Sequence, residues 1–177
     1  REVPWSSSNN ALVRVRSRRA IASGERGLGF THLFKTNGVF TVATKIGING
    51  FGRIGRQVFK AINERYGDTL EVVAINDLVD TETNANLLRY DSNYGPWDRE
   101  VQATRDGIAV DGRVVNVFSA RDTGQLPWGS AGAEICIEST GFFTDATKAV
   151  AHRRDCVKKV VISAPAKNED LTVVLGV

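Results

Sequence analysis

The chain has 177 residues, 42% of them hydrophobic, which is enough for one domain of ordinary size with a buried core. No run approaches the roughly 18–20 apolar residues of a membrane-spanning helix, and two cysteines without a CxxC motif argue against a disulfide framework or a zinc cluster. The net charge of +3 arises in residues 1–41, which hold seven Lys or Arg and two Asp or Glu. Residues 42–177 hold sixteen Lys or Arg and eighteen Asp or Glu, so this main part gives no electrostatic reason to expect nucleic-acid binding.

Residues 1–41 form a basic leader without clear periodicity, rich in Arg and Ser, with four arginines between 14 and 19. Three origins are open. The composition fits an organelle transit peptide. A GTG start codon at Val42 would instead make everything before it untranslated sequence, which is the interpretation we favour, and a structured extension is the third. Because the chain lacks Met and stops in the apolar run 171–177, we expect a fragment.

From residue 45 onward, strands and helices are expected to alternate. Apolar residues in the first helix recur at the spacing of a helix that packs on a sheet, and Gly67 ends it. The second strand is apolar and β-branched, as a strand buried on both faces is. Thr81 is the predicted N-cap of the second helix. The expected elements are a strand at 45–49, a helix at 53–66, a strand at 70–75 and a helix at 81–89.

Residues 99–120 look different, because short alternating strands are joined there by two Asp-Gly pairs, at 106–107 and 111–112. Asp-Gly accepts positive φ and is a strong hairpin signal, so we expect an antiparallel meander. The whole pattern predicts an α/β fold with a doubly wound (Rossmann), mostly parallel sheet and right-handed crossovers. The later expected elements are a strand within 133–140, a helix at 144–155, a strand at 158–165 and the start of another at 171–177.

The segment KIGINGFGRIGR carries the spacing G-x-G-x-x-G between the first strand and the first helix. Gly50 permits a tight turn, Gly52 lets the backbone approach a pyrophosphate, and Gly55 lets the helix pack close to the strand. The free N–H groups of Arg53 and Ile54 at the helix N-terminus would point at the anion. A plain tight turn with a closely packed helix is the alternative.

Asp77 follows the second strand, 22 residues beyond Gly55. A carboxylate there would accept hydrogen bonds from both hydroxyls of an adenosine ribose and would repel a 2′-phosphate. No Arg or Lys occurs between Glu71 and Asn86 to neutralise such a phosphate, so the predicted cofactor is NAD rather than NADP. A simple turn cap is the alternative for Asp77, and FAD enzymes use a similar loop.

Six segments occur in order: KIGINGFGRIGR, VVAINDLVD, LLRYDS, FSARD, ICIESTGFF and KKVVISAPAK. Over about 45–177 they closely resemble the NAD-binding half of the glyceraldehyde-3-phosphate dehydrogenase family, whereas residues 1–41 resemble nothing in it. The resemblance implies phosphorylating, NAD-dependent oxidation of glyceraldehyde 3-phosphate to 1,3-bisphosphoglycerate in glycolysis, with triose phosphate and inorganic phosphate as substrates. It also implies a homotetramer in the cytoplasm, or in a plastid if the leader is a transit peptide.

The resemblance assigns further residues to the cofactor and agrees with the glycine-loop and ribose assignments. Arg121 matches a residue at the adenine end of the site. Thr140 matches the strand end that passes the nicotinamide half, and Ser163 matches a residue that also contacts the cofactor there. Without the resemblance, Arg121 is a surface charge, Thr140 a strand-end cap and Ser163 an ordinary strand-end hydroxyl.

The family's nucleophile is a Cys in a later Ser-Cys-Thr-Thr-Asn motif, followed by a His base. Neither motif occurs here, so we expect both beyond residue 177 and no catalytic residue in this chain. Cys136 should be a buried, inert thiol with a raised pKa. Cys156, among basic residues, is expected to be structural, and His152 to be an exposed helix residue; His32 lies in the leader.

Two other functions stay open. Erythrose-4-phosphate dehydrogenase shares the fold and the motifs, and the aldehyde specificity is expected in the half that this chain lacks. The chain is otherwise a truncated dinucleotide-binding fragment without activity, and we expect no turnover from it alone.

Overall fold

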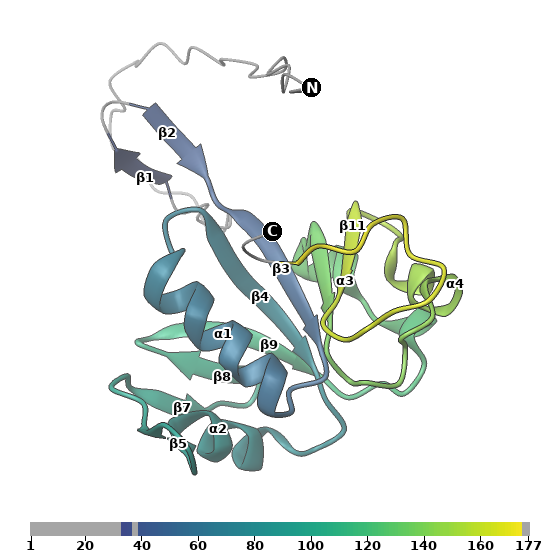
Figure 1. Ribbon diagram of the computed structural model, residues 1–177. Coiled ribbons are helices and arrows are strands. Elements are labelled where there is room, and N and C mark those ends of the chain that lie inside the picture. Colours follow the sequence, from purple (N-terminus) through teal and green to yellow (C-terminus); the bar gives the residue numbers. More distant parts are fainter. Residues whose placement is uncertain (1–32, 37–38, 175–177) are drawn as a thin grey trace. The chain divides into compact units, whose positions relative to one another are not determined.

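A computed structural model describes residues 33–36 and 39–174 of the chain (Figure 1). Most of the predicted leader over 1–41 lies outside the described residues. In its last part, β1 (Leu33–Thr36) pairs as an antiparallel strand with β2 (Val39–Val42), which ends one residue beyond the leader. The origin of the leader stays a prediction.

The body of the domain is a seven-stranded sheet in the order β11-β10-β3-β4-β9-β8-β7. Neighbours from β11 to β9 pair in parallel, and β9, β8 and β7 pair antiparallel. The predicted doubly wound, mostly parallel sheet and its meander are confirmed. The strands are β3 (Thr44–Asn49), β4 (Leu70–Asn76), β7 (Val101–Ala103), β8 (Gly107–Val110), β9 (Arg113–Phe118), β10 (Ile135–Glu138) and β11 (Lys159–Ile162).

Helices and short turns connect these strands, and a two-stranded ribbon of β5 (Tyr90–Asp91) and β6 (Gly95–Pro96) precedes the meander. The helices are α1 (Arg53–Arg65), α2 (Thr81–Arg89), α3 (Trp128–Ala131) and α4 (Ala146–Ala149), with the 3-10 helices η1 (Thr123–Gln125) and η2 (Val150–His152). The long first helix and the second helix are confirmed.

The predicted N-cap of α2 is wrong by one residue. Asp80, not Thr81, is the cap, because its carboxylate accepts hydrogen bonds from the backbone N–H of Thr83 at 2.8 Å and from its hydroxyl at 2.7 Å. These bonds hold the pKa of Asp80 below its ordinary value. The acid also suits the positive end of the helix dipole.

The helix predicted at 144–155 is much shorter in the structure. Asp145 caps α4, which tightens after one turn into η2, and Asp155 then adopts a left-handed φ of 54°. The strand expected at 171–177 is not formed at 171–174, and 175–177 lie outside the described residues. Leu171 and Val173 stay exposed, because no described strand pairs with them.

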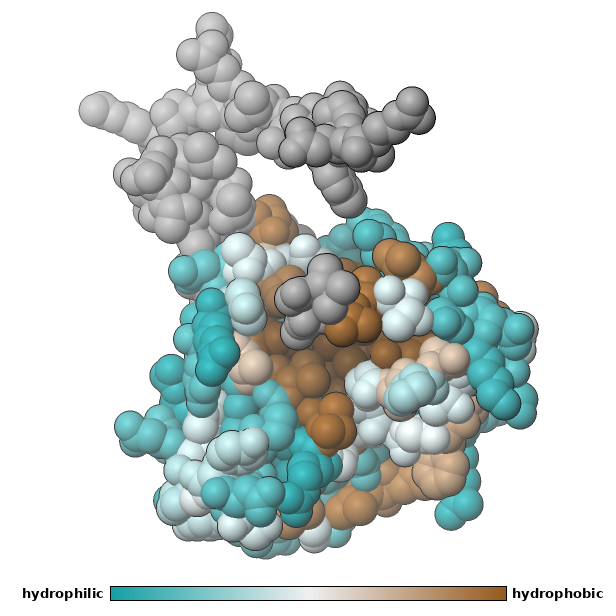
Figure 2. Space-filling view, in the orientation of Figure 1, coloured by the Kyte–Doolittle hydropathy of each residue, from teal (hydrophilic) through white to brown (hydrophobic). Residues whose placement is uncertain are grey.

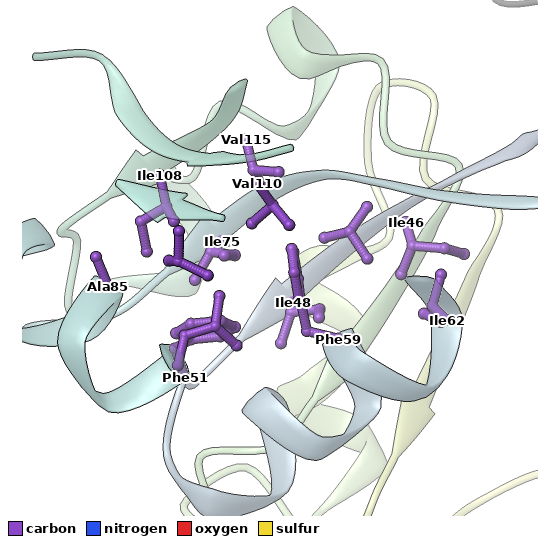
Figure 3. Close-up of a cluster of buried hydrophobic side chains, with 13 residues drawn as sticks. Ile46, Ile48, Phe51, Phe59, Ile62, Ile75, Ala85, Ile108, Val110 and Val115 are labelled. Carbon is purple, nitrogen blue, oxygen red and sulfur yellow. The ribbon is translucent and has the colours of Figure 1, made fainter. Parts of the chain in front are cut away.

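The sheet separates two apolar clusters. One cluster packs against α1 and α2 and includes Phe51 and Phe59 (Figure 3). The centroids of these two rings lie 5.7 Å apart in an edge-to-face arrangement. The other lies on the opposite face around Trp128, which is fully buried. Side chains alternate along β3, so Ile46 and Ile48 join the first cluster while Gly47 faces the second.

Apolar surface remains beside α1 on the face drawn in Figure 2. Ile137 and its register partner Val161 lie on the same side of β10 and β11 as the first cluster. Val161 is nevertheless half exposed, because α1 packs mainly against β4 and not against the edge strand β11.

Gly47 generates a stability prediction. An added Cβ would lie 2.8 Å from two ring atoms of Trp128, and this ring is buried and cannot move aside freely. We expect Gly47→Ala to lower the free energy of unfolding by about 1–3 kcal/mol, measured by urea denaturation followed by circular dichroism.

Gly67→Ala is the matched control, because an added Cβ there meets its nearest atom at 3.4 Å. It should change the free energy of unfolding by less than about 0.5 kcal/mol. Equal destabilisation by the two substitutions would contradict the packing of Trp128 on β3.

Candidate cofactor site

The glycine-rich loop between β3 and α1 has the geometry that its spacing predicts. Gly50 adopts a φ of +89°, and an added Cβ there would lie 2.6 Å from the Thr140 nitrogen. A Cβ on Gly55 would lie 2.1 Å from the Gly50 carbonyl oxygen, so α1 approaches the turn as only glycine allows. A Cβ on Gly52 would meet nothing within 4 Å, so the loop has open space on that side.

The N-terminus of α1 is open toward that space. Gly52 is its N-cap and makes no side-chain cap bond, and the first turn carries no acidic residue. Arg53 and Ile54 are both exposed. The first N–H groups of the helix and its dipole are therefore positioned to attract an anion. The Phe51 side chain is buried in the first apolar cluster and so attaches the loop to the core.

Asp77 lies at the carboxyl end of β4 and ties the glycine loop to it. One carboxylate oxygen accepts a hydrogen bond from the Phe51 backbone N–H at 2.6 Å, and the other accepts from Val79 N–H at 2.9 Å. The turn cap considered for Asp77 is thus present. Each oxygen keeps lone-pair capacity for a further donor such as a ribose hydroxyl. The tie to Phe51 has no signal in the sequence.

A buried carboxylate lies beneath the loop. Glu138, at the end of β10, is only 1% exposed. One oxygen accepts hydrogen bonds from the backbone N–H of Thr140 at 2.8 Å and from its hydroxyl. The other accepts from Asn49 Nδ2 at 2.6 Å. Burial acts to raise the pKa of Glu138, but hydrogen bonds from His152, Thr140 and Asn49 outweigh it and hold that pKa below the ordinary value.

The prediction that His152 is an exposed helix residue is wrong. The side chain is fully buried, because the tightening from α4 into η2 turns it toward the sheet. Trp128 Nε1 donates a hydrogen bond to His152 Nδ1 at 3.1 Å, and an indole N–H can only donate. The imidazole proton therefore sits on Nε2, which lies 3.0 Å from the second Glu138 oxygen and donates to it. The sequence held one signal, an acid in the apolar strand ICIE that needs a partner if buried.

The polar network continues along the sheet edge to β9. Asn76 Nδ2 donates to Asn49 Oδ1 at 2.7 Å and to the Ala120 carbonyl oxygen at 2.9 Å. Asn76 Oδ1 accepts from Ala120 N–H at 2.8 Å. Both asparagines are buried. Hydrogen bonds thus join the carboxyl ends of β9, β4, β3 and β10.

The structure brings the predicted site residues to one edge of the sheet. Arg121 follows β9, Asp77 follows β4, the glycine loop follows β3, Thr140 follows β10 and Ser163 follows β11. The chain leaves β3 to β4 on one side, and β10 lies on the other, which makes this edge a topological switch point where open α/β sheets bind ligands. Which of these residues contact the cofactor stays a prediction.

The two thiols lie away from this edge. Cys136 is buried in the second cluster, and burial, aided by the Glu138 charge, raises the pKa of its thiol, as predicted. Cys156 Sγ lies 3.0 Å from the Ala133 carbonyl oxygen. Within the described residues, no three His, Cys, Asp or Glu side chains are grouped to hold a metal, and no helix is long and apolar enough to span a membrane.

Comparisons with known proteins point to one family. A family model described as "Glyceraldehyde 3-phosphate dehydrogenase, NAD binding domain" matches residues 44–146. The chain is 54% identical over 136 residues to glyceraldehyde-3-phosphate dehydrogenase 1 of Streptomyces arenae and 53% identical over 134 residues to that of Bacillus cereus. The corresponding Bacillus subtilis (strain 168) protein is 49% identical over 136 residues.

These matches cover 76–77% of this chain but only 40% of each relative. The chain therefore spans about two fifths of the length of the curated relatives it matches.

Substitution of Trp128 tests the buried hydrogen-bond network of Trp128, His152 and Glu138. We expect Trp128→Phe to keep the aromatic packing but to leave His152 Nδ1 without its donor, and so to lower the free energy of unfolding by about 2–4 kcal/mol. In the unsubstituted protein, imidazole ¹⁵N shifts should show the proton on Nε2 alone.

Trp97→Phe is the control, because the Trp97 Nε1–H bonds to the exposed Glu64 carboxylate. It should cost about 1 kcal/mol. A His152 ring protonated on Nδ1 would contradict the assigned hydrogen-bond directions.

Proposed function

The chain belongs to the glyceraldehyde 3-phosphate dehydrogenase family, of which it carries the NAD-binding domain, and we propose that it holds NAD for the phosphorylating oxidation of glyceraldehyde 3-phosphate. The observation that carries the proposal is the sheet edge at which the glycine loop, the open helix N-terminus and Asp77 meet. The whole reaction is assigned to a longer protein, because the relatives are more than twice as long as the matched part.

Each residue of the edge has a proposed role. The backbone N–H groups of Arg53 and Ile54 bind the pyrophosphate, with Gly52 leaving room for it. Asp77 accepts hydrogen bonds from the adenosine ribose and disfavours a 2′-phosphate. Arg121 lies at the adenine end. Thr140 and Ser163, on the far side of the loop, take the nicotinamide half; this order follows the strand order β9-β4-β3-β10-β11.

NAD supplies a hydride acceptor when it is bound. The contribution of this chain is to bind and orient it on a rigid edge, with no thiol of its own in reach. The Cys nucleophile and the His base that the family resemblance implies are assigned to sequence outside these 177 residues. Glyceraldehyde 3-phosphate and inorganic phosphate are the proposed substrates, and a cytoplasmic homotetramer is the proposed state of the whole protein.

Calorimetric titration of the chain with NAD and with NADP tests the proposal. We expect saturable binding of NAD and much weaker binding of NADP. A folded chain, judged by circular dichroism, that gives no saturable heat with NAD would contradict it. Activity of the whole protein on glyceraldehyde 3-phosphate against erythrose 4-phosphate separates the two candidate substrates.

Asp77→Ala gives a sharper test of the cofactor preference. The substitution removes the ribose acceptor, the loop tie to Phe51 and the charge that opposes a 2′-phosphate. We expect NAD binding to weaken about tenfold and the preference over NADP to shrink, both measured by calorimetry.

Asp80→Ala is the matched control, because Asp80 also accepts a backbone N–H bond in a turn after β4 but caps α2 instead of facing the loop. Its ratio of NAD to NADP affinity should equal that of the unsubstituted chain. An unchanged ratio in Asp77→Ala would overturn the role given to Asp77.

A further inference from the structure

We propose that Glu138 is a positioning residue of the cofactor site. Its hydrogen bonds hold Thr140 in place and thereby fix the part of the site that binds the nicotinamide half of NAD. The inference rests on the proposed function, since it takes NAD to lie along this edge. Glu138 itself does not reach the surface, because its side chain is 1% exposed. It acts through the residue two positions further along the chain.

A carboxylate in this place needs an explanation beyond stability. Glu138 shares its side of β10 with Cys136 and faces the apolar cluster around Trp128. Burying a charge there costs free energy that an apolar residue of similar size would not. The charge is tolerated because four donors surround it, two from Thr140 and one each from Asn49 and His152.

The bonds to Thr140 fix both its backbone and its hydroxyl. One Glu138 oxygen receives the N–H and the Oγ1–H of this single residue. The Thr140 hydroxyl proton thus points toward the Glu138 carboxylate, and Oγ1 accepts a hydrogen bond from the Phe142 backbone N–H at 3.1 Å. What Thr140 presents to a ligand above it is therefore a lone pair, which suits a donor such as a ribose hydroxyl or an amide N–H.

The other carboxylate oxygen is held just as firmly. Asn49 immediately precedes the glycine loop, and its Nδ2 donates to Glu138 at 2.6 Å. His152 donates from Nε2, and Trp128 fixes this tautomer from the opposite side of the ring. Because Gly50 also packs directly on the Thr140 nitrogen, Glu138 keeps the pyrophosphate loop and the nicotinamide end in a fixed relation.

Glu138→Gln tests the proposal with little change of shape. A glutamine amide carries two donors, so in either orientation its NH₂ faces existing donors, Thr140 on one side or Asn49 and His152 on the other. We expect NAD binding to weaken about tenfold, because the nicotinamide end loses its fixed acceptor. ADP, which lacks both the nicotinamide and the ribose that carries it, should bind within about twofold of its normal affinity.

Comparing the affinities of the two ligands separates a positioning role of Glu138 from a general loss of structure in Glu138→Gln. Equal weakening of NAD and ADP, or no weakening of either, overturns the role of Glu138 while leaving the proposed function intact. An unsubstituted, folded chain that binds neither ligand overturns the proposed function and this inference with it. Thr140→Ser, which keeps both donors, should bind NAD normally, whereas Thr140→Val should show the selective loss.

A measurement on the unsubstituted chain covers the case in which Glu138→Gln does not fold. A hydroxyl proton donated to a buried carboxylate exchanges slowly with water, so the Thr140 Oγ1–H should appear as a separate proton NMR signal. Absence of this signal, together with equal NAD affinity in Thr140→Ser and Thr140→Val, overturns the proposal.

Discussion

The architecture of the site depends on how closely α1 approaches the end of β3. At Gly55 the helix lies against the Gly50 carbonyl with no room for a Cβ, and Ser139 Oγ donates a hydrogen bond to that same carbonyl at 2.7 Å. This contact fixes where the helix begins, and so where its unpaired N–H groups point. A Cβ at Gly55 would push the helix away from this carbonyl and so shift its first N–H groups relative to the polar ends of the neighbouring strands.

The electrostatics of the edge follow from that arrangement. A dinucleotide brings two negative phosphates, and the edge contains two carboxylates of its own, Asp77 and Glu138. Both are satisfied by backbone or side-chain donors, and the Glu138 charge is enclosed by Thr140, Asn49 and His152 below the surface. The open face therefore retains the positive helix N-terminus, while the negative charges serve to hold loops in place.

Local patterns in the sequence were enough to predict most strands, the meander and the glycine turn, because each depends on neighbours within a few residues. The role of Asp77 toward the cofactor stays a prediction. Apart from the N-cap of α2, which lies one residue earlier than predicted, the failures lie where tertiary contacts decide. The region 144–155 has helical composition, but α4 ends at Ala149, and His152 in the following η2 is buried, where Trp128 donates a hydrogen bond to it. The sequence predicts Glu138 only as part of a strand, since nothing local shows that Asn49, 89 residues away, would pair with it.

The same contacts keep both thiols and the imidazole of the described residues away from the proposed cofactor site. Both cysteines of the chain lie in the described residues, and neither lies at the carboxyl edge of the sheet: Cys136 is buried behind it with a raised pKa, and Cys156 lies against the Ala133 carbonyl. The only described histidine is committed on both nitrogens to Trp128 and Glu138, so it has no free position with which to accept a proton from a thiol. Within the described residues, no thiol and imidazole are therefore placed to act as a nucleophile–base pair at this edge, and the proposed contribution of the edge is to fix the position of the cofactor.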